Sequence, residues 1–228
     1  MLQFSLVEQI ALAVFLLSGI SFFLYHLLLR LKIILKGKSD FSVEELPKRI
    51  IRVFDEVILH KKVASGKRKS AGILHALVMY GFIFFGLITL NHFGMAFGFP
   101  IFSDSFRHTY FLIFGAPWAI LCTIGILGLA YRRFVIKPEA LGKFSSTSAL
   151  VSVFIVTLMT TYLIDELHIL SGAAEKFNWW LHSGVIGGFL FLIPQSKHMH
   201  LVLSPFNIFL RPFEVPSHGA IPIDMEAS

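Results

Sequence analysis

Long stretches without any charged residue are the feature that most constrains this chain. A helix that crosses the hydrocarbon core of a bilayer needs about 20 mostly apolar residues. Five stretches of 20 or more uncharged residues occur in the sequence. They predict spanning helices with cores near residues 9–29, 72–93, 109–131, 146–164 and 178–196. We therefore expect an all-α integral membrane protein that folds as a five-transmembrane-helix bundle.

The composition supports this expectation and excludes several other classes of protein. Hydrophobic residues make up 55% of the chain and charged residues only 15%, whereas about a quarter of the residues of a soluble domain are charged. The same values exclude a disordered chain, a collagen and a water-soluble nucleic-acid-binding domain, so we expect no nucleic acid partner. The single cysteine, Cys122, excludes a disulfide framework and a cysteine-held iron–sulfur cluster within this chain.

The lysines and arginines lie almost entirely on one side of the predicted bundle. Twelve lie in residues 30–70, four in residues 132–145 and two in residues 197–228, which leaves only Arg107 and Lys176 on the other side. Cytoplasmic loops of membrane proteins carry an excess of these residues. We therefore expect the lipid bilayer of the cell membrane as the location, with the N-terminus outside and the C-terminus cytoplasmic.

The basic segment 30–70 contains a second pattern. Between residues 41 and 64, apolar side chains recur at helical spacing opposite a charged face. This pattern predicts an amphipathic helix that either lies on the membrane surface or docks a cytoplasmic partner. Residues 212–228 contain three prolines and little periodicity, which is typical of an extended tail or linker after a membrane domain that covers residues 1–211.

The ten histidines are unusual in so apolar a chain, because ionisable side chains are costly in a bilayer and mark functional sites there. His75 and His92 lie 17 residues apart, near opposite ends of the second predicted span. His182 and His200 are 18 residues apart and share one face of the last helix if that helix continues past Lys197. Eighteen residues correspond to five turns and a rise of about 27 Å, nearly the thickness of a membrane.

These spacings predict two histidine pairs between antiparallel helices. His75 would meet His200 near the inner surface, and His92 would meet His182 near the outer surface. Imidazoles from two facing helices are suitable axial ligands for haem iron, so we expect two haem b groups with these four histidines as iron ligands. The alternative for any one histidine is a side chain that reaches the membrane interface. We apply that interpretation to the histidines in loops and at helix ends: His26, His60, His108, His198 and His218.

Two segments, residues 75–86 and 181–209, carry a family resemblance. They resemble the cytochrome b subunits of the respiratory nitrate reductase gamma type and, more closely, the membrane domain of heterodisulfide reductase-like iron–sulfur proteins. The most specific part is the final helix, where two histidines with 17 residues between them flank a Pro-x-Ser-Lys turn, here His182, Pro194, Ser196, Lys197 and His200.

The two families that the chain resembles differ in the second-span histidine that binds the outer haem. In the nitrate reductase branch, a histidine follows the equivalent of His75 at a position that is Phe85 here, and phenylalanine cannot bind iron. The heterodisulfide reductase-like branch has its histidine at the end of the second span, here His92. The resemblance therefore implies His92 as an outer-haem ligand, while His75 and His200 match both branches.

The resemblance also implies a function, namely electron transfer between a membrane quinone and a cytoplasmic iron–sulfur protein. That partner is a separate subunit or a fused domain, and the chain would be an electron-transfer subunit of a quinone-linked oxidoreductase complex. Asp165, Glu166 and His168, at the outer end of the fourth predicted span, are the polar groups best placed to exchange protons with a quinol. Alternatively, they only mark the water boundary of that span.

Two other functions remain open at this point. The chain could be a haem-free membrane anchor that holds a redox partner. It could also be a transporter, although transporters often show internal repeats and broken helices at the midplane. No repeat is visible in this sequence, and the paired histidines lie near the two surfaces, which disfavours transport.

Overall fold

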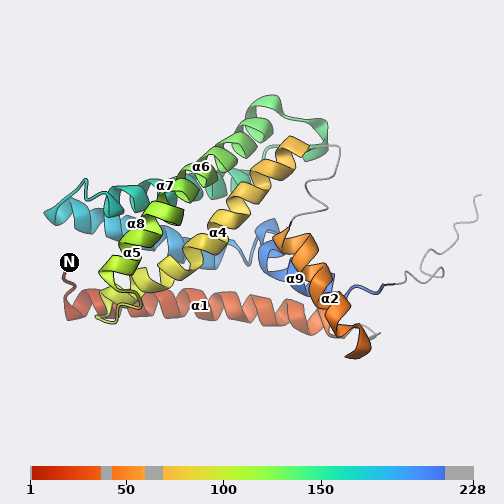
Figure 1. Ribbon diagram of the computed structural model, residues 1–228, viewed down its shortest axis with the longest axis horizontal. Coiled ribbons are helices and arrows are strands. Elements are labelled where there is room, and N and C mark those ends of the chain that lie inside the picture. Colours follow the sequence, from red (N-terminus) through yellow and green to blue (C-terminus); the bar gives the residue numbers. More distant parts are fainter. Residues whose placement is uncertain (1, 37–42, 60–68, 214–228) are drawn as a thin grey trace, which may run out of the picture.

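The computed structural model describes residues 2–36, 43–59 and 69–213, and the regular structure of these residues is helical (Figure 1). This confirms the predicted all-α class for the described part of the chain. Five helices form the body of the molecule: α1 (Leu6–Ile34), α4 (Lys69–Ala96), α6 (Ala116–Tyr131), α7 (Ser146–Glu166) and α8 (Gly172–Leu192). Three shorter helices join them: α2 (Leu46–Val53), α5 (Asp104–Tyr110) and α9 (His200–Leu210).

Polar capping residues determine where two of the long helices, α1 and α7, begin. At the start of α1, the Ser5 hydroxyl accepts a hydrogen bond from the Glu8 backbone N–H at 3.4 Å, and the Glu8 carboxylate accepts one from the Ser5 N–H at 2.8 Å. This capping box satisfies two of the N–H groups that a helix leaves unpaired at its start. The Ser145 side chain caps α7 in a similar way, by accepting from the Ser148 N–H.

Among the described residues, four helical stretches are long and apolar enough to cross a membrane. They match the first four predicted spans and extend them slightly: Leu6–Ile34, Lys69–Ala96, Asp104–Ile136 and Ser146–Glu166. The chain is therefore a multi-pass, membrane-associated helical protein. The fifth predicted span corresponds to α8, which has 21 residues. Its first turns contain Glu175, Lys176 and Asn178, and these polar residues lower its mean hydropathy below that of the other four.

The helices pack as a chain of neighbours, with α4 on α6, α6 on α7, α7 on α8 and α8 on α1 (Figure 1). Glycines allow the close approaches, as expected for helices in a membrane. A Cβ atom on Gly125 of α6 would lie 2.8 Å from the Leu74 carbonyl oxygen of α4. In the described chain, α4 and α8 are not among the closely packed pairs, so the space between these two helices is filled by side chains and cavities.

The last predicted helix is broken, which corrects the sequence prediction. Helix α8 ends at Leu192, the chain turns, and α9 begins at His200 after a short 3₁₀ segment, Lys197–Met199. Pro194 lies in this turn. Proline has no N–H to donate, and its ring clashes with the carbonyl group four residues earlier in a helix. The prediction that His182 and His200 share one face of one continuous helix is therefore wrong.

The basic segment between α1 and α4 is helical where it is described. It comprises a 3₁₀ turn (Val43–Glu45), α2 and a π-helical turn (Phe54–Ile58), within the predicted range 41–64. The rest of that range, and of the predicted tail 212–228, lies largely outside the described residues. Apolar side chains of this segment are exposed, with Ile50 and Ile51 of α2 at 55% and 60% of full exposure and Phe54 of the π-helical turn at 52%. Both predicted uses of this face, membrane contact and partner docking, agree with that exposure.

The polar side of α2 faces α9 and fixes its position. Arg49 is only 2% exposed. Its guanidinium donates to the Phe209 carbonyl at 2.9 Å, to the Arg211 carbonyl at 3.2 Å and to the Glu45 carboxylate at 2.7 Å. A buried charge needs such partners, because leaving it unpaired costs several kcal/mol. The two carbonyl contacts therefore tie α2 to the end of α9, while the ion pair with Glu45 stays within the first turns of the α2 segment.

Candidate functional site

Two pairs of histidines lie at opposite ends of α4. The ring centroids of His75, on α4, and His200, at the start of α9, are 6.0 Å apart. Those of His92, on α4, and His182, on α8, are 4.9 Å apart. After the predicted topology, we name His75 and His200 the inner pair and the opposite end of α4 the outer end. The structure thus brings together both pairs expected from the sequence, although a broken helix rather than a continuous one positions His200. Their role as iron ligands remains a prediction.

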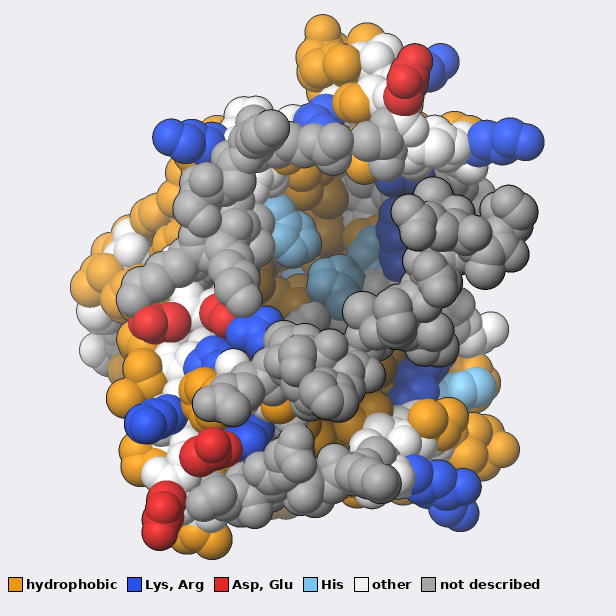
Figure 2. Space-filling model, turned by 90° about the vertical axis from the view of Figure 1, so that its right-hand side faces the viewer, with side chains coloured by type: hydrophobic (Ala, Val, Ile, Leu, Met, Phe, Trp, Pro, Cys, Tyr) orange, Lys and Arg blue, Asp and Glu red, His pale blue; other side chains and the backbone are white. Residues whose placement is uncertain are grey.

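The inner pair lines a cavity of about 310 Å³ between α4, α8 and α9. His75, His200, His198 and Lys197 line it together with apolar side chains such as Val78. Figure 2 looks onto the end of the molecule where α4 begins, and it shows histidine side chains inside a hollow. Because a metal ion lies roughly 2 Å from a ligating imidazole nitrogen, two imidazoles on opposite sides of one metal hold their centroids about 6 Å apart. The inner pair has this separation.

The hydrogen bond of His200 determines which of its nitrogens can bind a metal. Its Nδ1 lies 2.8 Å from the Lys197 carbonyl oxygen. A carbonyl oxygen can only accept, so Nδ1 carries a proton, and Nε2 is the ring nitrogen that a metal could bind. Ligating histidines usually donate their other ring N–H in this way, which fixes the tautomer and the orientation of the ring.

His182 is oriented in the same way at the outer end. Its Nδ1 lies 2.7 Å from the Thr161 hydroxyl, which donates its single hydrogen to the Thr157 carbonyl at 2.7 Å. The hydroxyl therefore accepts from Nδ1–H, and Nε2 of His182 keeps its lone pair. Asn178 reinforces this contact between α7 and α8, because its side chain donates to the Thr161 carbonyl at 2.9 Å.

His92 is placed differently from the other three. Its Nε2 lies 2.9 Å from the Ser183 hydroxyl, and its ring stacks on Trp179 with centroids 4.7 Å apart and an interplanar angle of 15°. The separation of 4.9 Å from His182 is about 1 Å shorter than one shared metal ion needs. His92 would therefore have to exchange the Ser183 contact for iron and move away from His182.

An apolar space connects the two pairs. A cavity of about 300 Å³ lies between α4 and α8 and shares several residues with the inner cavity, among them Val78, Phe82 and Phe189. It shares others with a cavity of about 50 Å³ that reaches His92 and His182. A flat apolar ring system requires space of this kind between its ligand helices. The donors and this space fit a haem at the inner pair, whereas the outer pair would fit one only after His92 moves away from His182.

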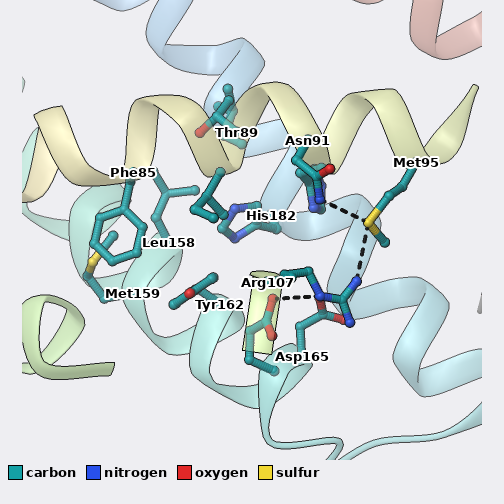
Figure 3. A pocket seen from close by; sticks show the side chains of 14 residues that line it. Phe85, Thr89, Asn91, Met95, Arg107, Leu158, Met159, Tyr162, Asp165 and His182 are labelled. Carbon is teal, nitrogen blue, oxygen red and sulfur yellow. Dashed lines mark hydrogen bonds and ion pairs between the residues drawn. The ribbon is translucent and has the colours of Figure 1, made fainter. Parts of the chain in front are cut away.

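The predicted proton-exchanging residues gather at the outer end. Asp165 and Glu166 end α7, and His168 lies in the following turn with φ = 51°. All three line one cavity of about 430 Å³. Arg107 pairs with Glu166, with 3.6 Å between Nε and Oε1, and Figure 3 shows Arg107 and Asp165 beside His182. Among the described residues, no group of three or more His, Cys, Asp or Glu side chains could hold a metal ion, so a protein-only metal centre has no candidate there.

The sequence analysis missed several residues that shape these sites. His198, which we assigned to a loop, lines the inner cavity. Burial and the neighbouring Lys197 charge lower the pKa of His198 to about 4, so its imidazole is neutral at pH 7. Thr161, Ser183 and Arg107 also contact the predicted residues. Their hydroxyl and guanidinium groups inside apolar stretches were the available signal, but only the packing shows which histidine or carboxylate each one meets.

Comparison with known proteins gives one relative. The chain is 30% identical over 224 residues to the probable iron-sulfur-binding oxidoreductase FadF of Bacillus subtilis (strain 168), and the match covers 84% of this chain and 31% of that protein. The chain thus spans less than a third of the length of this relative. No family model matches the chain, and no solved structure matches it. This membrane-associated helical protein is therefore distantly related to an iron–sulfur oxidoreductase.

Proposed function

We propose that this protein is a di-haem b membrane subunit that carries electrons between the quinone pool and a cytoplasmic iron–sulfur partner. The observation that carries the proposal is the inner pair, where the ring centroids of His75 and His200 lie 6.0 Å apart, both residues line one cavity, and Nδ1 of His200 donates to the Lys197 carbonyl. The relation to a protein named as a probable iron-sulfur-binding oxidoreductase supports a redox function over transport.

In this proposal, each residue of the two sites has a defined role. His75 and His200 hold the inner haem, and His92 and His182 hold the outer haem. Haem b supplies reversible one-electron transfer when it is bound. The chain itself contributes the ligand nitrogens, the hydrogen bonds from Nδ1 that orient His182 and His200, and the apolar lining that excludes water between α4 and α8.

We further propose five spans, with α8 as the fifth, in the cell membrane. Its 21 residues are long enough to cross the hydrocarbon core, and it packs between α1 and α7. The helices alternate in direction, so the described basic residues at the end of α1, in α2, between α6 and α7 and after α8 lie at one end of the bundle (Figure 1). The positive-inside rule makes this end cytoplasmic and places the N-terminus outside.

The partner binds at this cytoplasmic end. The only cysteine of the chain is buried Cys122, so the iron–sulfur cluster must belong to another polypeptide or to another part of a longer one. The exposed side chains of Ile50 and Ile51 in α2 and of Phe54 in the π-helical turn provide an apolar contact surface for that partner. At the outer end, Asp165, Glu166 and His168 exchange protons with the quinone.

The visible spectrum and haem content of the purified full chain in detergent test this function. We expect b-type bands and two haems per chain. His75→Ala or His200→Ala should each remove one haem, and His182→Ala or His92→Ala the other. His168→Ala is the matched control, because His168 lines the outer cavity but is not part of either pair.

The outcomes separate the proposal from its alternatives. A colourless protein that still binds its partner would show a haem-free membrane anchor. If His92→Ala retains both haems with unchanged spectra, the outer assignment is wrong, and loss of one haem in His168→Ala would then identify His168 as the ligand. Substrate flux in liposomes that lack any redox partner would instead show a transporter.

A further inference from the structure

A single cation lies in the acidic cavity at the outer end of the molecule. This cavity of about 430 Å³ is lined by residues of the N-terminal segment and of helices α4, α5, α7 and α8. Among the described residues that line it, Arg107 is the one lysine or arginine, beside the carboxylates of Asp104, Asp165, Glu166 and Glu175. The sequence analysis assigned Arg107 no role except as one of the two basic residues on the outer side.

The guanidinium of Arg107 makes only weak polar contacts. Its Nε is 3.6 Å from the Glu166 carboxylate, and its NH1 is 3.2 Å from the Met95 sulfur (Figure 3). A normal N–H···O hydrogen bond is about 2.7–3.2 Å long, and a thioether is a weak acceptor. Among the described residues, this guanidinium makes no hydrogen bond to an oxygen atom. A group with five N–H donors thus remains available to an oxygen acceptor in the cavity.

The position of Arg107 connects this cavity to the outer histidine pair. Met95, Arg107, Asp165 and Glu166 line both the large cavity and the small cavity at His92 and His182. Trp179 also lines the large cavity, and its other contacts include the stacked ring of His92. A molecule bound against Arg107 is therefore separated from the outer pair only by this wall of side chains.

We propose that Arg107 is the positioning residue for a neutral quinone or quinol headgroup in this cavity, and that its guanidinium donates hydrogen bonds to one ring oxygen. This inference rests on the proposed function and deepens it. The volume lies within the range of small-molecule sites, and Phe4 and Trp179 contribute aromatic walls. The four carboxylates disfavour binding of a phosphate group, because like charges repel one another. A neutral headgroup meets no such repulsion.

Direct binding of a quinone tests the inference without measuring activity. The full chain in nanodiscs of phosphatidylcholine is titrated with a tritium-labelled naphthoquinone that carries a short isoprenoid tail. We expect saturable binding by the wild-type protein and a Kd raised about tenfold or more in Arg107→Gln, because a hydrogen bond to a charged donor is lost. Arg107→Lys should give an intermediate Kd. Arg132→Gln, the same change near the opposite end of the helical stretch Asp104–Ile136, should leave the Kd unchanged.

The results that overturn the inference are distinct from those that overturn the proposed function. Equal Kd values for Arg107→Gln and wild type, with unchanged haem content, would refute the role of Arg107 alone. A second experiment uses nanodiscs that contain phosphatidylglycerol and measures how much of this lipid each chain retains. If Arg107→Gln lowers the amount of that lipid retained per chain and leaves quinone binding unchanged, the site binds a lipid phosphate instead. If wild type binds no quinone saturably, the quinone role itself fails, although the haem assignment stands on its own test.

Discussion

Replacing Thr161 by valine removes the hydroxyl from the outer site, and with it the contact to His182 and a hydrogen bond to the Thr157 carbonyl of the same helix. Threonine and valine have nearly the same shape, and Thr161 is only 4% exposed. The variant loses the contact of 2.7 Å between the hydroxyl and Nδ1 of His182. The Thr161 carbonyl, which accepts from Asn178, is part of the backbone and remains. The packing between α7 and α8 is therefore retained while the ring of His182 loses its orienting partner.

The size of the effect follows from the role of that partner. Removing a hydrogen-bond acceptor of a ligating histidine typically costs 10–100-fold in metal affinity or activity, which corresponds to about 1.4–2.7 kcal/mol. The lost acceptor also makes the imidazole a weaker electron donor, so we expect the midpoint potential of the outer haem to rise. The inner haem should not change, because His200 is oriented separately by the Lys197 carbonyl.

The assay is a redox titration of the purified variant, followed by its visible spectrum, with the haem content measured in parallel. Thr160→Val is the matched control, because it makes the same change at the neighbouring, exposed position of α7. Thr161→Val should release one haem more readily, or shift one of two potentials, while Thr160→Val should match the wild type. If Thr161→Val retains both haems with both potentials unchanged, the reasoning from the His182 tautomer is wrong.

Two further predictions concern the packing that holds the sites. Gly187→Ala should lower the stability by about 1–3 kcal/mol, because the added Cβ would lie 2.0 Å from the Phe15 ring. Gly184→Ala, which meets no atom within 4 Å, should leave the thermal unfolding midpoint in detergent unchanged, and equal midpoints for both variants would contradict this packing. Arg49→Met should speed amide hydrogen exchange in α9, because the end of that helix loses two donors. Lys48→Met, the exposed neighbour, should not, and unaltered exchange in both variants would show that α9 is held by other contacts.

The sequence determined the helical class and four of the spans, because both depend on local composition. A run of about 20 apolar residues is stable in hydrocarbon only when its backbone groups pair within the run, and a helix achieves this without any partner segment. The histidine pairs were also predictable in outline, because antiparallel helices of known rise bring residues at matching depth together. The same arithmetic could not foresee that Pro194 ends α8 and that His200 begins a separate helix.

Only the tertiary structure decided what each polar group contacts. The sequence contains Thr161 and Arg107 within or beside apolar runs, but the carbonyl, histidine and carboxylate that they meet come from other turns and other helices. The same holds for the separation of 6.0 Å at the inner pair and 4.9 Å at the outer pair. Hydropathy and helix rise determine only how deep each residue lies along the axis of its helix. Hydrogen bonds and ligand distances depend instead on how the helices rotate and pack against one another. That arrangement is a property of the whole bundle.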